Sequence, residues 1–219
     1  MKAWICVFAL LSTAAQAWPS IDFPDGARVE VAAEDTSYNG FPMRTWVMHD
    51  RQSQMMTAAF FRKQWKADSE LFDEQMFQGD YIINSLQPPY LLTARIANTG
   101  SGVTAYVGIT QSLEEHQLKT PGDQFPMPAQ TRVLTDQVST DLYKQGRTLV
   151  LSSDGSVSSL FNFYQSHYRR RGWVDNGSLL DPAAGKGALL MSRDQKELNI
   201  SIERRQGKSY LVVNSVSRG

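Results

Sequence analysis

The sequence predicts an α+β fold built from two tandem copies of one module, each with the order strand-strand-helix-strand-strand-strand. Each copy is expected to form an antiparallel sheet with one helix packed on a face. Two observations predict this fold. Stretches with helical periodicity occur at matching places in the two parts of the chain, and runs of β-forming residues bounded by turn residues surround both.

The clearer helix signal runs from Ser156 to Arg171. Ser156 can accept a backbone N–H bond at the amino end, and Gly172 can adopt the left-handed conformation that ends a helix. Apolar residues recur at three- and four-residue steps, which places them on one face. These residues are Val157, Leu160, Phe161, Tyr164 and Tyr168.

A shift of 103 residues places this helix on an earlier one, 53–66, without a gap. The same shift aligns the preceding strand, because Arg147-Thr148-Leu149-Val150 falls on Arg44-Thr45-Trp46-Val47. From Arg44 to Trp65 the two copies share five identities in 22 positions. Matching order, spacing and aromatic residues therefore favour a duplication over two unrelated α+β stretches.

The remaining elements are predicted as strands with short connections, which favours an antiparallel meander. The expected strands are 28–33, 43–48, 80–85, 91–97 and 103–109 in the first copy, and 131–135, 147–152, 188–192, 198–203 and 210–216 in the second. The first module is assigned to 18–113 and the second to 131–219. Between them, 114–130 contains three prolines and is predicted to be a linker.

Residues 1–17 have the pattern of a secretory signal peptide. Lys2 precedes a short apolar run, and Ala15-Gln16-Ala17 matches a small-residue cleavage site. The run is too short for a membrane span, which needs roughly 20 apolar residues. Cleavage after Ala17 would leave a mature chain of 202 residues that begins at Trp18 and has no membrane span.

The composition of the mature chain narrows its location and partners. Without Lys2, 21 basic residues stand against 22 acidic ones, so the charge gives no reason to expect nucleic acid as a partner. The one cysteine, Cys6, leaves with the signal peptide. Because small domains secreted by eukaryotes usually depend on disulfides, an exported chain without cysteine favours the periplasm of a Gram-negative bacterium.

The sequence contains no motif that defines a catalytic, cofactor or metal site, so neither a cofactor nor a metal is expected, and a non-enzyme is favoured over an enzyme. The three histidines are far apart and lack metal-ligand spacing. Ser153 and Asp154 join a strand to a helix but read as a turn before the N-cap. They would be the candidates, with His167, for a hydrolase with an unfamiliar active site. The acidic residues of 68–74 are expected to form a solvated loop.

Two groups of residues are candidates for contact with a partner protein. The first copy is rich in aromatic and methionine side chains, more than a short sheet can bury, and an exposed apolar patch marks a contact surface. The candidates there are Phe41, Met43, Trp46 and Tyr90. In the second copy, Arg169, Arg170 and Arg204 belong to basic runs that could form one patch, although arginines also suit a helix end and a hairpin tip.

The expected function is therefore that of an exported accessory protein that binds an envelope protein, as assembly or secretion factors do. Contact would be made through an exposed sheet edge, a groove or the aromatic patch. The alternatives are a binding module for a small apolar or lipidic ligand, and a hydrolase. The sequence leaves the oligomeric state and the identity of the partner open.

Overall fold

The structure is a computed structural model that describes residues 18–141 and 143–218. The predicted signal peptide, 1–17, lies outside the described residues. Within the described part, two α-helices accompany thirteen strands, so the sheet-dominated α+β class predicted from the sequence is confirmed.

The two halves of the chain have similar element orders. The first half contains β1 (Arg28–Tyr38), β2 (Phe41–Asp50), α1 (Gln54–Trp65), the short 3-10 helix η1 (Lys66–Asp68), β3 (Leu71–Phe77), β4 (Asp80–Gln87), β5 (Tyr90–Thr99) and β6 (Gly102–Gln111). The connection contains a second 3-10 helix, η2 (Glu115–Gln117). The second half contains β7 (Thr131–Asp141), β8 (Lys144–Ser153), α2 (Val157–Arg169), β9 (Val174–Asp175), β10 (Leu179–Asp181), β11 (Lys186–Arg193), β12 (Lys196–Arg205) and β13 (Lys208–Arg218).

Both helices begin as the sequence predicts. The Ser53 side chain accepts a hydrogen bond from the Met56 amide at 3.3 Å, and the Ser156 side chain accepts one from the Ser159 amide at 3.1 Å. Each bond satisfies one of the amides that a first helical turn leaves unpaired. After α2, Gly172 has a φ of +79°, which only glycine adopts readily.

Strand β3 is a difference from the sequence prediction, which placed a solvated acidic loop there. Gln78 and Gly79 have φ values of +52° and +90°, as a type I′ hairpin turn requires. This turn folds Leu71–Phe77 onto β4, from the pair Phe77–Asp80 to the pair Leu71–Leu86. The acidic side chains therefore lie on a strand at the end of the sheet.

The two sheets expected from the sequence are one continuous sheet. The order is β10-β11-β12-β13-β8-β7-β1-β2-β6-β5-β4-β3, with β9 paired to β11. The halves join where β1 and β7 pair antiparallel, from Asp35–Thr140 to Tyr38–Gln137. Strand β1 continues five residues beyond the predicted 28–33, and this extension supplies the backbone groups that pair with β7.

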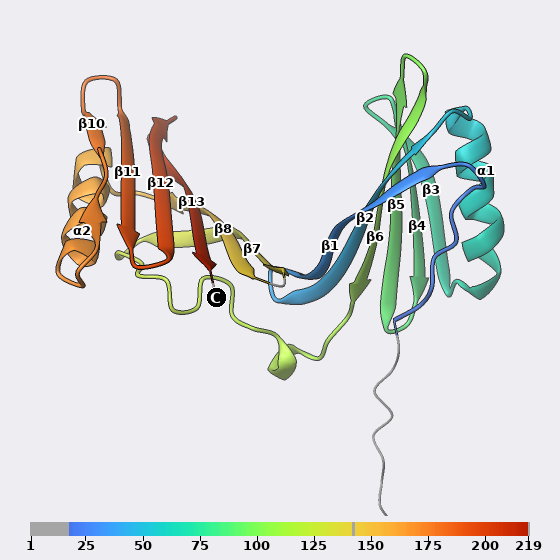
Figure 1. The fold of residues 1–219 in the computed structure, drawn as a ribbon, viewed down its shortest axis with the longest axis horizontal. Helices are drawn as coiled ribbons and strands as arrows, with labels where there is room; N and C mark the ends of the chain where they lie inside the picture. Colours follow the sequence, from blue (N-terminus) through green and yellow to red (C-terminus); the bar gives the residue numbers. More distant parts are fainter. Residues whose placement is uncertain (1–17, 142, 219) are drawn as a thin grey trace, which may run out of the picture.

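The sheet bends into a U, and the helices lie on its outer side, one at each end (Figure 1). Each helix covers a separate core. Under α1, Phe61 and Trp65 pack on β4, β5 and β6, and under α2, Tyr164 packs on strands of the second half. Complete burial of each such side chain stabilises the fold by about 1.5–3 kcal/mol.

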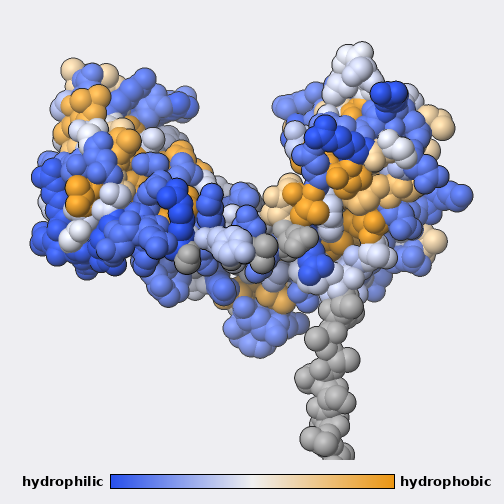
Figure 2. Space-filling view, in the orientation of Figure 1, coloured by the Kyte–Doolittle hydropathy of each residue, from blue (hydrophilic) through white to orange (hydrophobic). Residues whose placement is uncertain are grey.

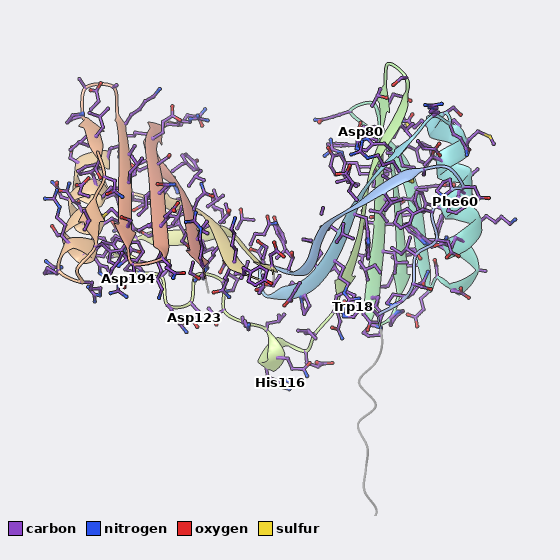
Figure 3. All side chains as sticks on the ribbon, viewed as in Figure 1. Trp18, Phe60, Asp80, His116, Asp123 and Asp194 are labelled. Carbon is purple, nitrogen blue, oxygen red and sulfur yellow. The ribbon has the colours of Figure 1, made fainter. Side chains whose placement is uncertain are left out.

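The connecting segment is held against the second half. Gly122 N–H donates to a carboxylate oxygen of Asp136 at 2.8 Å, and the Arg147 guanidinium donates to the carbonyl of Asp123 at 2.9 Å. The Phe125 ring lies 5.5 Å from the Tyr164 ring. Asp123 and His116, labelled in Figure 3, mark the course of this segment below the sheet.

Candidate functional site

The sheet has one covered and one uncovered face, and side chains alternate between them. Along β5, Leu92, Ala94 and Ile96 are buried under α1, while Leu91, Thr93 and Arg95 point to the opposite face. Because both helices lie outside the U, the uncovered faces of the two halves line its inside. We call this surface the inner face. Figure 2 shows the wide hollow that it borders, with hydrophobic residues on both sides.

In the first half, the inner face combines exposed apolar side chains with a polar network. Tyr106 is 56% exposed and stands opposite Arg95 on the neighbouring strand. Arg95 Nε donates to a carboxylate oxygen of Asp80 at 2.5 Å, and Figure 3 labels Asp80 on the side toward the hollow. His49 Nδ1 lies 3.0 Å from Thr104 Oγ1. These contacts orient the polar side chains around Tyr106.

In the second half, the inner face contains an open hollow of about 500 Å³. Its apolar lining includes Tyr210, Val212 and Leu179, and Leu179 is 70% exposed. Charged groups stand at its rim. Glu203 forms ion pairs with Arg205 and Lys186, and the hydrogen bond from Arg205 holds the Glu203 pKa below its ordinary value. With Asp181, the rim has two acidic and two basic residues, so its charges balance and the apolar lining is the main feature.

The joint between the halves is built around Asp136, a buried carboxylate. It accepts hydrogen bonds from Arg147 Nε at 2.9 Å and from Arg147 Nη2 at 2.7 Å. Its backbone is bonded to the turn of the first half, because Asn39 N–H donates to the Asp136 carbonyl and Asp136 N–H donates to Asn39 Oδ1. Burial opposes ionisation of Asp136, but the bonds from Arg147 and Gly122 outweigh it, so its pKa lies below the ordinary value.

A second hollow, of about 460 Å³, lies on the outer side of this joint. The connecting segment, the carboxyl end of α2 and the central strands form its walls. Its charged residues are of both signs in equal number, with Lys119, Arg147 and Lys196 against Asp123, Asp136 and Glu197. Asp136 and Arg147 already pair with each other, so this hollow presents no ligand-specific charge.

The structure places the predicted contact residues of the first half in different settings. Met43 lies on the inner face, since it pairs with Thr110. Trp46 lies on the outer side, half-buried, with its ring 6.3 Å from that of Phe23. Phe41 is half-buried opposite Tyr38 at the start of β2. Tyr90 is buried in the core, with its ring 5.5 Å from that of Trp18 and tilted by 42°, so its ring is not an exposed contact surface.

The predicted arginines do not form one patch. Arg169 pairs with Asp175 at 2.7 Å, and Arg170 is exposed beside it at the carboxyl end of α2. Arg204 instead donates to the carbonyl of Gly155, just before the amino end of the same helix. A helix of thirteen residues is about 20 Å long. The two groups of arginines are therefore separated by that length.

The candidate hydrolase residues are separated in the same way. Ser153 Oγ accepts hydrogen bonds from Thr131 and from Gly155 N–H, and Asp154 lies 3.8 Å from Lys208. His167 is near the other end of α2, packed against Phe163 and Tyr168. Burial, with help from the nearby arginines, lowers the pKa of His167. A serine and a base this far apart cannot exchange a proton directly.

The described residues contain no group of three or more His, Cys, Asp and Glu side chains able to hold a metal ion. Among the same residues, no helix has the length and apolar character needed to cross a membrane. Comparison of the chain with protein-family models, with curated proteins and with solved structures finds no match.

Sequence reasoning did not single out Tyr106 and Tyr210, the exposed tyrosines of the inner face. Both lie within predicted strands, at positions that alternate with buried residues such as Val107 and Leu211. A two-residue period assigns them to the face opposite the core. The missing information was that no second layer covers that face.

Proposed function

We propose that this protein is a non-enzymatic accessory protein of a Gram-negative envelope, exported to the periplasm, and that it binds a segment of another protein on its inner face. The supporting observation is that the inner face is uncovered across both halves. Exposed apolar side chains are grouped on this face in both halves, among them Tyr106 in the first and Leu179 and Val212 in the second, and grouped exposed apolar side chains mark interaction sites. The exposed tyrosines, Tyr106 and Tyr210, are of the residue type enriched in protein interfaces.

The size of the inner face favours a protein over a small ligand. Twelve neighbouring strands at a spacing of about 4.8 Å extend roughly 50 Å. With strands of about eight residues, the area is roughly 1,300 Å², above the about 800 Å² that each partner contributes to a standard interface. Small-molecule sites enclose most of their ligand, whereas the hollows on this face are open.

The proposal is tested by placing a photo-crosslinking amino acid at Tyr106 or Tyr210 and, as a control, at Met55 on the solvent side of α1. We expect the two inner positions to capture the same envelope protein and Met55 not to capture it. Binding is then measured with purified components, where Tyr106→Glu should weaken it about tenfold or more. Equal capture at Met55, or a co-purified lipid in place of a protein, would contradict the proposal.

Export is tested separately, by N-terminal sequencing of the protein recovered from the periplasmic fraction of a Gram-negative host. We expect the sequence to begin at Trp18, as cleavage after Ala17 requires. Recovery from the cytoplasm with Met1 intact would contradict export and would leave the inner-face proposal standing.

We also propose that the two halves are copies of one module. The shared order of strands and helix, and the two serine N-caps 103 residues apart, support this interpretation. In an experimental structure, the halves should superpose with Phe61 on Tyr164 and Trp65 on Tyr168. Halves that superpose only in another register would contradict a duplication.

A further inference from the structure

The two ends of the sheet differ in how their outermost backbone is protected. At one end, β10 is three residues long and is followed at once by Pro182, and β9 is two residues long. At the other end, β3 pairs with β4 at all seven positions without a register shift. On its other side, β3 has no strand partner within the described residues.

The turn before β4 determines which backbone groups of β3 are free. In a two-residue type I′ hairpin, the residues that flank the turn form a hydrogen-bonded pair, here Phe77 and Asp80. Hydrogen-bonded pairs alternate along an antiparallel ladder. The N–H and C=O groups of Phe72, Glu74 and Met76 therefore point away from β4, into solvent.

Strand β3 lacks most of the features that usually protect an edge. Natural edge strands are very short, bulged, or carry proline or charged side chains, lysine above all. Strand β3 is seven residues long, has no bulge, proline or lysine, and its charges are the carboxylates of Asp73 and Glu74. Three of its apolar side chains are more than half exposed: Leu71 at 65%, Met76 at 56% and Phe77 at 52%. An edge with these properties accepts a further strand readily.

The charge around β3 indicates what kind of strand it accepts. From Asp68 to Asp80 there are five acidic residues and no basic one. Arg62 neutralises Glu74 at 2.8 Å, and Arg95 neutralises Asp80. In the described structure, the other three carboxylates, of Asp68, Glu70 and Asp73, form no ion pair. Lys66 Nζ also lies beside the strand, 5.7 Å from the centre of the Phe72 ring. Three carboxylates against this one ammonium leave the net charge of the edge negative.

From these observations, we propose that β3 is a docking edge for an extended, basic segment of another protein, which adds to the sheet as a further strand. Backbone bonds to Phe72, Glu74 and Met76 hold the segment, and its lysine or arginine side chains face Asp73 and its neighbours. A second copy of this chain is a poorer occupant. A second copy would bring its own uncompensated carboxylates, those of Asp68, Glu70 and Asp73, to the same edge, and the juxtaposition of like charges is destabilising. This proposal does not depend on the inner face.

The test uses the mature protein and a synthetic peptide that alternates lysine and valine over the length of β3, with a matched peptide of glutamate and valine. Hydrogen exchange is followed residue by residue. At a peptide concentration about ten times its Kd, we expect exchange at Phe72, Glu74 and Met76 to slow about tenfold. The glutamate peptide should leave these amides unchanged, and salt should weaken the lysine peptide's effect.

Two substitutions at one position separate strand addition from apolar adhesion. Met76→Pro removes a solvent-facing donor and no bond to β4, which an edge strand tolerates. Met76→Thr keeps the donor and removes the apolar side chain. We expect the peptide's effect to be lost in Met76→Pro and kept in Met76→Thr, with exchange in β4 and β5 unchanged in both. Equal protection by both peptides, binding that survives Met76→Pro, or no protection at all would overturn the proposal.

Discussion

The two helices occupy equivalent places in their halves but are anchored in different ways. In α1, Gln54 is a buried polar residue whose Nε2 donates to the carbonyls of Gly79 at 3.0 Å and Ile96 at 2.8 Å. The position 103 residues later is Val157, an apolar residue within the core under α2. One half thus uses a satisfied polar contact where the other uses apolar packing.

At a second pair of matching positions, the apolar residue lies in the first half and the polar one in the second. Phe61 is fully buried under α1, and the position 103 residues later is Tyr164, also fully buried. Within the described structure, the Tyr164 hydroxyl has no hydrogen-bond partner. Burial raises the pKa of Tyr164 above its ordinary value, so the group is neutral at physiological pH. The comparison shows that one backbone arrangement accepts polar or apolar side chains at a given site, provided that each polar atom finds a partner or its desolvation is offset by packing.

The largest effect is expected from removal of the shared aromatic anchor. Phe61→Ala should destabilise the protein by about 3–5 kcal/mol, because it removes a fully buried ring and leaves a cavity. Urea unfolding measures the change. Phe60→Ala, at the half-buried neighbouring position labelled in Figure 3, should cost less. Equal losses would mean that the first half is not packed around Phe61.

The next largest loss of stability is expected from a substitution in the joint between the halves. Asp136→Asn should destabilise by about 2–3 kcal/mol, less than loss of a fully buried ion pair, because Arg147 is 23% exposed. Asp123→Asn, at an exposed carboxylate on the connecting segment, is the control and should stay within about 0.5 kcal/mol.

Asp136→Asn should also change how the stability of the protein depends on pH. The folded-state pKa of Asp136 is lowered, so its ionised form stabilises the fold above the unfolded pKa of about 3.9. This contribution disappears as pH falls through the lower, folded-state pKa. Below about pH 4, the stability of the parent protein should therefore decrease more steeply than that of Asp136→Asn. Parallel pH profiles would show that Asp136 is not ionised in the joint.

A smaller effect is expected when the polar anchor of α1 is replaced by its apolar counterpart. Gln54→Val should cost about 2 kcal/mol, because a buried carbonyl loses its donor. Gln52→Val, at an exposed position, is the control. Thermal unfolding followed by circular dichroism measures both. An unchanged Tm in Gln54→Val would show that the two anchors are interchangeable.

The smallest expected change in stability is an increase. Tyr164→Phe, which introduces the residue type found at the matching position of α1, should stabilise by about 1 kcal/mol, since it removes a buried hydroxyl without a partner. Tyr168→Phe is the matched control, because Tyr168 borders the outer hollow. A loss of stability in Tyr164→Phe would indicate that its hydroxyl has a partner in solution.

Most helices and strands of this protein could be located from local sequence patterns alone. Helix periodicity and the serines at 53 and 156 located both helices, and alternating apolar residues located most strands, because these signals depend on neighbours a few residues away. Strand β3 was missed because acidic residues such as Asp73 and Glu74 are uncommon in strands, and because its turn, Gln78-Gly79, lacks the usual Asn-Gly or Asp-Gly pair. The apolar surplus of the first half was noticed, but Tyr90 proved to be buried.

The continuity of the sheet and the surfaces that it leaves open depend instead on contacts between residues far apart in the sequence. The pairing of Ser37 with Val138 joins residues about a hundred positions apart, and no local pattern specifies such a partner. The same pairing merges two sheets into one U. The helices cover only the outer side of the U, so its inner face has no covering layer, and the strand order leaves β3 at one end of the sheet. Backbone hydrogen bonds between strands can be made by any residue except proline, so residue type alone does not specify the strand order. Topology therefore decides which surfaces are open, and the residues on them, such as Tyr106 and Asp73, indicate what they bind.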